Sequence, residues 1–161
     1  MFYEDKQLDA AEEAASRAIT LSGKGDQYLV CESHRLLGKI YRSKGEREKA
    51  ISHFEAALGI ASPFNWHGTL FWVHYALAEL FFGEDGFDDA HAHIERAKSH
   101  AVENAYLLGR AMELQADFWY EQHRDEEAKS EVLRAANLYE KVGSVRGSEN
   151  CRILLQKYKR S

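Results

Sequence analysis

The feature that most constrains the fold is a set of aromatic residues at nearly equal intervals along the 161-residue chain. Successive members are 39, 40, 38 and 39 residues apart: Phe2, Tyr41, Phe81, Trp119 and Tyr158. Alanines follow each of the first four aromatics nine and sixteen residues later. Because several columns keep one register over the whole chain, the sequence predicts an array of internal repeats.

Each repeat has the pattern of two helices that pack closely. Small residues such as Gly38 stand three places before the aromatic, and together with the alanine columns they let two helices approach. Large residues such as Phe54 and Ile94 fill the space between one pair and the next. Short polar segments join the helices, with Gly45 and Gly86 as natural breaks.

Composition favours the same fold class. Ala, Leu, Glu, Lys and Arg, all good helix formers, dominate, and the chain has a single proline. Apolar residues make up 45% and charged residues 29%, which is typical of an ordered globular chain. We therefore expect an all-α fold with seven or eight helices.

Charge and hydropathy exclude several function classes. The net charge of −5 argues against nucleic acid as a partner, and the basic tail "CRILLQKYKR" is only a weak alternative. The chain contains no apolar run of the roughly 20 residues that a membrane span needs, so no membrane partner is expected.

The two cysteines indicate a reduced setting. Cys31 and Cys151 are far apart and form no C-x-x-C motif, so neither a disulfide framework nor a zinc site is indicated. Both thiols are interpreted as small buried hydrophobes. The amino terminus is acidic and lacks the apolar stretch of a secretory signal. A cytoplasmic location is therefore expected.

The columns together resemble the tetratricopeptide repeat family, whose pattern is Leu-Gly or Leu-Ala, an aromatic three later, then Ala, a large residue and Ala. The period of 38 to 40 exceeds the family's usual 34, and four other residues replace its early tryptophan: His34, His74, Met112 and Cys151. The resemblance implies a right-handed α-solenoid of about 3.5 repeats. Longer repeats of this sort look like arrays attached to signalling NTPases.

The predicted layout is one array over residues 1–161. Residues 3–22 would be the second helix of a truncated repeat, and residues 145–160 a capping helix. Three full repeats are expected at 26–61, 65–101 and 104–142. The start in mid-repeat leaves two alternatives: the chain is a segment of a longer protein, or it self-associates through the open N-terminal helix.

In the family, the first helix of each repeat lines a concave groove. Carried over by position, the resemblance predicts partner-binding residues on three helices: Glu32, Arg35, Lys39, Arg42 and Ser43; Trp72, Tyr75, Glu79, Phe82 and Gly83; Arg110, Glu113, Asp117, Tyr120 and Glu121. This groove would run from basic through aromatic to acidic. Aromatic and arginine side chains are typical of binding hot spots, so a protein or peptide partner is expected.

The family's best-known ligand, the acidic carboxyl terminus of a chaperone, is not expected here. Its clamp needs Asn where Lys39 and Ala76 stand, and a basic residue where Leu114 stands. The runner-up function is a sensor or scaffold segment of a larger signalling NTPase.

No motif indicates catalysis or a bound metal. The eight histidines include no His-x-x-x-His pair, and His91 and His93 lie on different sides of a helix. The segment "SGKGD" lacks the spacing of a phosphate-binding loop. We therefore expect a non-catalytic interaction module without a metal or cofactor.

Overall fold

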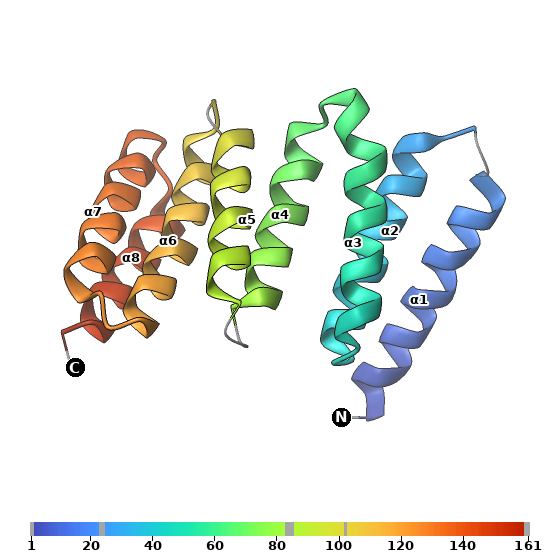
Figure 1. The fold of residues 1–161 in the computed structure, drawn as a ribbon, viewed down its shortest axis with the longest axis horizontal. Helices are drawn as coiled ribbons and strands as arrows, with labels where there is room; N and C mark the ends of the chain where they lie inside the picture. The colour runs from blue at the N-terminus through green and yellow to red at the C-terminus, as the bar shows by residue number, and fades with distance from the viewer. Residues whose placement is uncertain (1, 23–24, 83–85, 102, 160–161) are drawn as a thin grey trace. The chain divides into compact units, whose positions relative to one another are not determined.

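The computed structural model of the chain is built from α-helices (Figure 1). It describes residues 2–22, 25–82, 86–101 and 103–159, with side chains from residue 7 onward. Eight α-helices, one 3-10 helix and no strand occur in these ranges, which confirms the predicted all-α class.

The helices are α1 (Phe2–Ser22), α2 (Gln27–Ser43), α3 (Arg47–Ala61), η1 (Ser62–Phe64), α4 (His67–Phe81), α5 (Phe87–His100), α6 (Ala105–Glu121), α7 (Asp125–Lys141) and α8 (Val145–Lys157).

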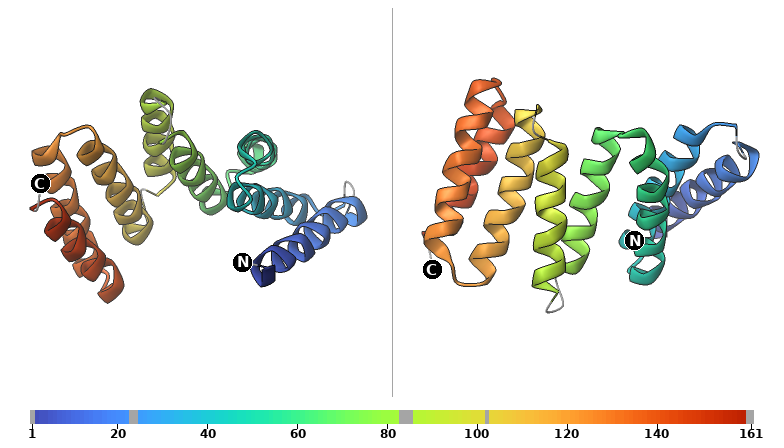
Figure 2. Two further views of the ribbon diagram at one scale, coloured as in Figure 1. Left: turned by 90° about the horizontal axis from the view of Figure 1, so that it is seen from below. Right: turned by 45° about the horizontal axis from the view of Figure 1, so that its top comes forward.

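The chain divides into two compact units, Met1–Leu80 and Phe81–Ser161. In the first unit α1 packs against α2, and α2 against α3. In the second unit α6 packs against α5 and α7, and α8 packs against both α7 and α6. Within each unit, helices that follow one another directly in the chain run antiparallel (Figure 2). The predicted repeat and domain boundaries stay predictions.

The repeat columns form the core of these helix pairs. The large residues Phe54, Ile94 and Val132 are fully buried. The alanine columns have no exposed surface from the second repeat onward: Ala50, Ala57, Ala90, Ala97, Ala128 and Ala135. An alanine presents little more than backbone, so these positions let neighbouring helices pack closely. The interpretation of both columns as packing positions is confirmed.

The turns show two different uses of glycine. Gly45, between α2 and α3, has a φ of +76°, a left-handed conformation that glycine adopts without a steric penalty. Gly86 instead caps the start of α5 with a φ of −84°. A Cβ atom there would lie 2.9 Å from the carbonyl oxygen of Phe81. Gly86 is therefore required for close approach, whereas Gly45 is required for its backbone conformation.

Both thiols lie in the core, as predicted. Cys31 and Cys151 are free and buried, and the Cys31 thiol donates a hydrogen bond to the carbonyl oxygen of Ala57. Burial raises the pKa of Cys31 to about 11 and that of Cys151 to about 12. A thiol with a raised pKa is a poor nucleophile near neutral pH, so both cysteines are packing residues.

Candidate functional site

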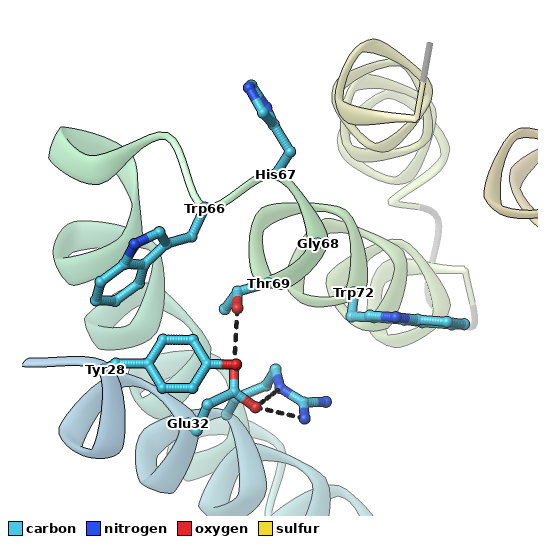
Figure 3. Close-up of a pocket in the computed structure, with 8 residues that line it drawn as sticks. Tyr28, Glu32, Trp66, His67, Gly68, Thr69 and Trp72 are labelled. Atoms are coloured by element: carbon cyan, nitrogen blue, oxygen red, sulfur yellow. Dashed lines mark hydrogen bonds and ion pairs between the residues drawn. The ribbon is translucent and has the colours of Figure 1, made fainter. Parts of the chain in front are cut away.

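A hollow of about 310 Å³ lies between the first half of α2 and the start of α4, within the first unit (Figure 3). Asp26 caps α2 by accepting a hydrogen bond from the amide of Leu29 at 2.9 Å, which fixes where this helix begins. Eight residues line the hollow: Tyr28, Glu32, Arg35, Trp66, His67, Gly68, Thr69 and Trp72. The residues from α2 share one helix face because they follow at intervals of four and three.

Aromatic rings form much of the wall of this hollow. Tyr28 and Trp66 meet edge to face with their ring centroids 5.1 Å apart, and Trp72 lies on the opposite side (Figure 3). Phe64 stacks on Trp66 with the ring centroids 4.7 Å apart. The left-handed backbone of Asn65, with a φ of 51°, turns the chain between these two rings. The walls therefore offer a large, rigid contact area at low conformational cost.

A polar network crosses the floor of the hollow and joins α2 to α4. Arg35 donates to Oε2 of Glu32 through Nε at 2.8 Å and Nη2 at 2.6 Å. Thr69 donates to Oε1 of the same carboxylate at 2.8 Å. Burial opposes the charge of Glu32, but the hydrogen bonds from Arg35 and Thr69 outweigh it and lower its pKa. Arg35 is thus committed to an intramolecular pair.

Two further cations extend the same face of α2. Arg42 pairs with Glu79 of α4. Lys39 lies between Arg35 and Arg42, is exposed, and forms no ion pair or hydrogen bond within the described part of the chain. Partial desolvation lowers the pKa of Lys39, and the charges of Arg35 and Arg42 add to this effect, whereas those of Glu32 and Glu79 oppose it. Lys39 is therefore an exposed cation beside two ion pairs, and a ligand carboxylate would favour its charged form.

The predicted aromatic residues of the second repeat are placed differently from one another. Trp72 is half-buried and lines the hollow. Tyr75 is 8% exposed, with its ring 5.7 Å from that of Trp72. Phe82 belongs to the second unit, where its ring lies 4.7 Å from Phe118. Gly83 lies outside the described residues. Of the three aromatics, only Trp72 lines the hollow.

The predicted residues of α6 are mostly engaged within the second unit. Glu113 is only 7% exposed and lies 3.4 Å from Arg110. Asp117 accepts hydrogen bonds from Lys157 at 2.9 Å and from the Tyr158 hydroxyl at 3.2 Å.

Tyr120 and Glu121 are the last two residues of α6. Tyr120 stacks on the ring of Tyr158 at 4.3 Å, whereas Glu121 is exposed. Because α6 and α2 belong to different units, the predicted groove across all three helices stays a prediction.

Sequence reasoning missed five of the eight residues that line the hollow: Tyr28, Trp66, His67, Gly68 and Thr69. Tyr28 could have been found, because it lies seven residues before Arg35 and hence on the same face of α2. Trp66 precedes α4, so helical periodicity gives it no position. Thr69 lies three residues before Trp72, but its hydrogen bond to Glu32 depends on how α2 and α4 pack.

The described ranges contain neither a metal-binding cluster nor a membrane-spanning helix. No group of three or more His, Cys, Asp or Glu side chains lies close enough together there to hold a metal ion. None of the described helices is both long enough and apolar enough to cross a membrane.

One stretch of the chain matches a known protein family. The tetratricopeptide repeat family model matches residues 32–63, which run from within α2 to η1. Residues 32–63 are thus similar to a tetratricopeptide repeat. Repeats of this kind typically form protein-interaction modules, and this one contributes Glu32, Arg35, Lys39 and Arg42 to the face described above. The resemblance that the sequence predicts is thereby confirmed.

A solved structure shows the same fold over nearly the whole chain. BtubC (BKLC) from P. vanneervenii has a TM-score of 0.69 and 19% sequence identity, and the match covers 97% of this chain and 72% of that chain. At this identity the likeness concerns the fold alone, which is a tetratricopeptide-like α-solenoid. No curated protein sequence matches the chain. The predicted NTPase association and self-association through α1 stay predictions.

Proposed function

We propose that this chain is a non-catalytic interaction module that binds a peptide segment of a partner protein on the face formed by α2 and α4. The observation that carries the proposal is the aromatic hollow beside a cation that forms no ion pair with any of the described residues. Tyr28, Trp66 and Trp72 supply the walls of the hollow, and Lys39 supplies a charge next to them. The two buried free thiols support a cytoplasmic location.

The chemistry of this face specifies the peptide. The hollow has room for an apolar or aromatic side chain of the peptide, and Lys39 can form an ion pair with an acidic one. Glu32, in the middle of the α2 residues that line the hollow, precedes Lys39 by about 10 Å along the helix axis, at roughly 1.5 Å per residue. An extended chain covers this distance in about three residues. We therefore expect an apolar residue and an acidic residue about three positions apart.

Arg35 has a supporting role in this proposal. Its guanidinium holds the Glu32 carboxylate, which in turn holds Thr69 of α4. Reversing the charge of Arg35 would place two carboxylates side by side and disturb the face itself. Lys39, which supports no such network, is therefore the better residue to change.

Peptide display against the wild-type chain, run in parallel against Lys39→Glu, tests the proposal. We expect the wild type to enrich peptides with the apolar and acidic spacing, and the variant to lose them. Lys141→Glu, at the exposed end of α7 in the second unit, is the matched charge-reversal control and should keep them. Enriched peptides that bind Lys39→Glu as tightly as wild type would overturn the assignment.

A further inference from the structure

Gln115 is a polar residue in a column that is otherwise apolar. The residue four places before the repeat aromatic is leucine in the other cases: Leu37, Leu77 and Leu154. Leu37 and Leu77 are buried with 2% exposure, and Gln115 has no exposed surface at all. An amide in place of a core leucine is unfavourable unless both its oxygen and its nitrogen are paired.

Only one end of this amide is paired. Oε1 of Gln115 lies 3.1 Å from Nδ1 of His91, which donates to it when the imidazole proton is on Nδ1. Nε2 of Gln115 is buried and has no hydrogen-bond partner among the described residues. Buried donors in native proteins are almost always paired, so this nitrogen points to an interaction outside the described residues.

Gln115 is one of the residues that surround a hollow of about 200 Å³, formed by the start of α5, the second half of α6 and the turn that leads to α7. Aromatic rings line it: Phe87 meets Phe118 edge to face at 5.4 Å. Arg124 lies over the Trp119 ring at 5.2 Å. All of these residues belong to the second unit, so this site is separate from the α2–α4 face.

The charges around the hollow select the ligand class. Asp88 lines it, and Arg124 pairs with Glu127 at 3.2 Å. A carboxylate ligand would face the charge of Asp88, whereas a cation would face that of Arg124. An apolar ligand would leave Nε2 of Gln115 without a partner. A neutral group with a carbonyl acceptor, N–H donors and a flat surface satisfies the amide, Asp88 and the aromatic walls together.

We propose that this hollow is a second binding site, which takes a primary amide group as carried by an asparagine or glutamine side chain of a partner protein. The amide carbonyl accepts a hydrogen bond from Nε2 of Gln115, and the amide N–H₂ group donates toward Asp88. The aromatic rings enclose its plane. This site goes beyond the proposed function and does not depend on it.

Acetamide is the simplest probe of this chemistry. In a ¹⁵N-labelled full-length chain, the side-chain NH₂ signals of Gln115 are assigned by their absence in Gln115→Leu, which restores the residue of the other repeats. We expect saturable shifts of these signals and of the Trp119 indole on titration with acetamide. Acetate and methylammonium should give no saturable shift.

The variant gives the second measurement, since the Trp119 indole still reports on binding when Gln115 is gone. We expect Gln115→Leu to fold and to bind acetamide about tenfold more weakly, as for the loss of one buried hydrogen bond. To test whether a protein side chain can supply the amide group, peptides that carry one glutamine are compared with matched glutamate peptides. Three results would each overturn the proposal: no saturable shift with acetamide, an equal response to acetate, or unchanged affinity in Gln115→Leu.

Discussion

The ring of Phe54 occupies the space that a side chain on Gly38 would need: a Cβ atom on Gly38 would lie 2.6 Å from Cδ1 and Cε1 of that ring. Phe54 is fully buried, so its ring has little room to move. This contact is the reason why α2 and α3 approach so closely at this point.

Replacing Gly38 by alanine should therefore destabilise the fold. Overpacking a filled core costs about 1–3 kcal/mol, which outweighs the gain of up to about 1 kcal/mol from the better helix former. Gly59→Ala is the matched control, because Gly59 is exposed on α3 with nothing within 4 Å of its added Cβ. Chemical denaturation should show a loss for Gly38→Ala and a small gain for Gly59→Ala. Equal stability of the two variants would contradict the packing described here.

The pair formed by His34 and His53 should make the stability depend on pH. Their Nδ1 atoms are 2.9 Å apart, so one must donate and the other must accept. Burial lowers the pKa of both rings, and His53 lowers that of His34 further. A lowered folded-state pKa means that the unfolded chain binds protons first as the pH falls. The stabilisation is thus present above pH 6.5, the ordinary histidine value, and is lost below it.

Unfolding free energies measured from pH 7.5 to 5 test this dependence. His34→Met, which uses the residue that Met112 places in the same repeat column, should reduce the loss on acidification. His123→Asn is the control, because it removes an exposed histidine from a left-handed turn position that asparagine tolerates. If the unfolding free energy of His34→Met falls as steeply with pH as that of the wild type, the pair of histidines has no role in this pH dependence.

The buried Glu113 should make the chain less stable at neutral pH than an uncharged side chain at the same position would. Burial raises the pKa of Glu113, and the Tyr139 hydroxyl and the charge of Arg110 only partly offset this. The folded chain therefore holds the proton more tightly than the unfolded chain, and stability falls as the pH rises through the folded-state pKa. Glu113→Gln should be more stable than wild type at pH 8. The difference should shrink as the pH approaches 4.5, the ordinary value.

A second buried glutamate provides the opposite case. Glu131 pairs with Lys98 at 3.1 Å and with Arg134 at 2.7 Å. Glu131→Gln leaves these cations without their counter-charge and should destabilise the fold by about 1–3 kcal/mol. Thermal unfolding of both variants at pH 8 should give shifts of opposite sign. Shifts of the same sign would mean that burial alone does not distinguish the two carboxylates.

Spacing alone predicts the packing core well. The alanine columns and the apolar positions at Phe54 and Ile94 depend only on helical periodicity, which the sequence carries directly. Other core contacts depend on packing that no period reveals. Tyr139, for example, fills the space beside Gly109 and Gly147, where Cβ atoms would lie 2.7 Å and 2.4 Å from its ring.

The candidate site was predicted only in part, for a physical reason. Position in the repeat indicates which side of a helix Arg35 and Glu113 occupy. It does not indicate that Arg35 is held by Glu32, or that Glu113 is buried in its own unit. Trp66 lies between helices, where local backbone conformation rather than periodicity decides the direction of the ring.

The most direct test is a charge exchange between Lys39 and the acidic residue of a peptide selected on the wild-type chain. Fluorescence anisotropy gives Kd for the wild type and Lys39→Glu, each with the original peptide and with a peptide whose acidic residue is replaced by lysine. We expect each single change to weaken binding at least about tenfold, or about 1.4 kcal/mol. The doubly exchanged pair should recover most of that loss. A doubly exchanged pair that binds no better than either single change would contradict the assignment of this face.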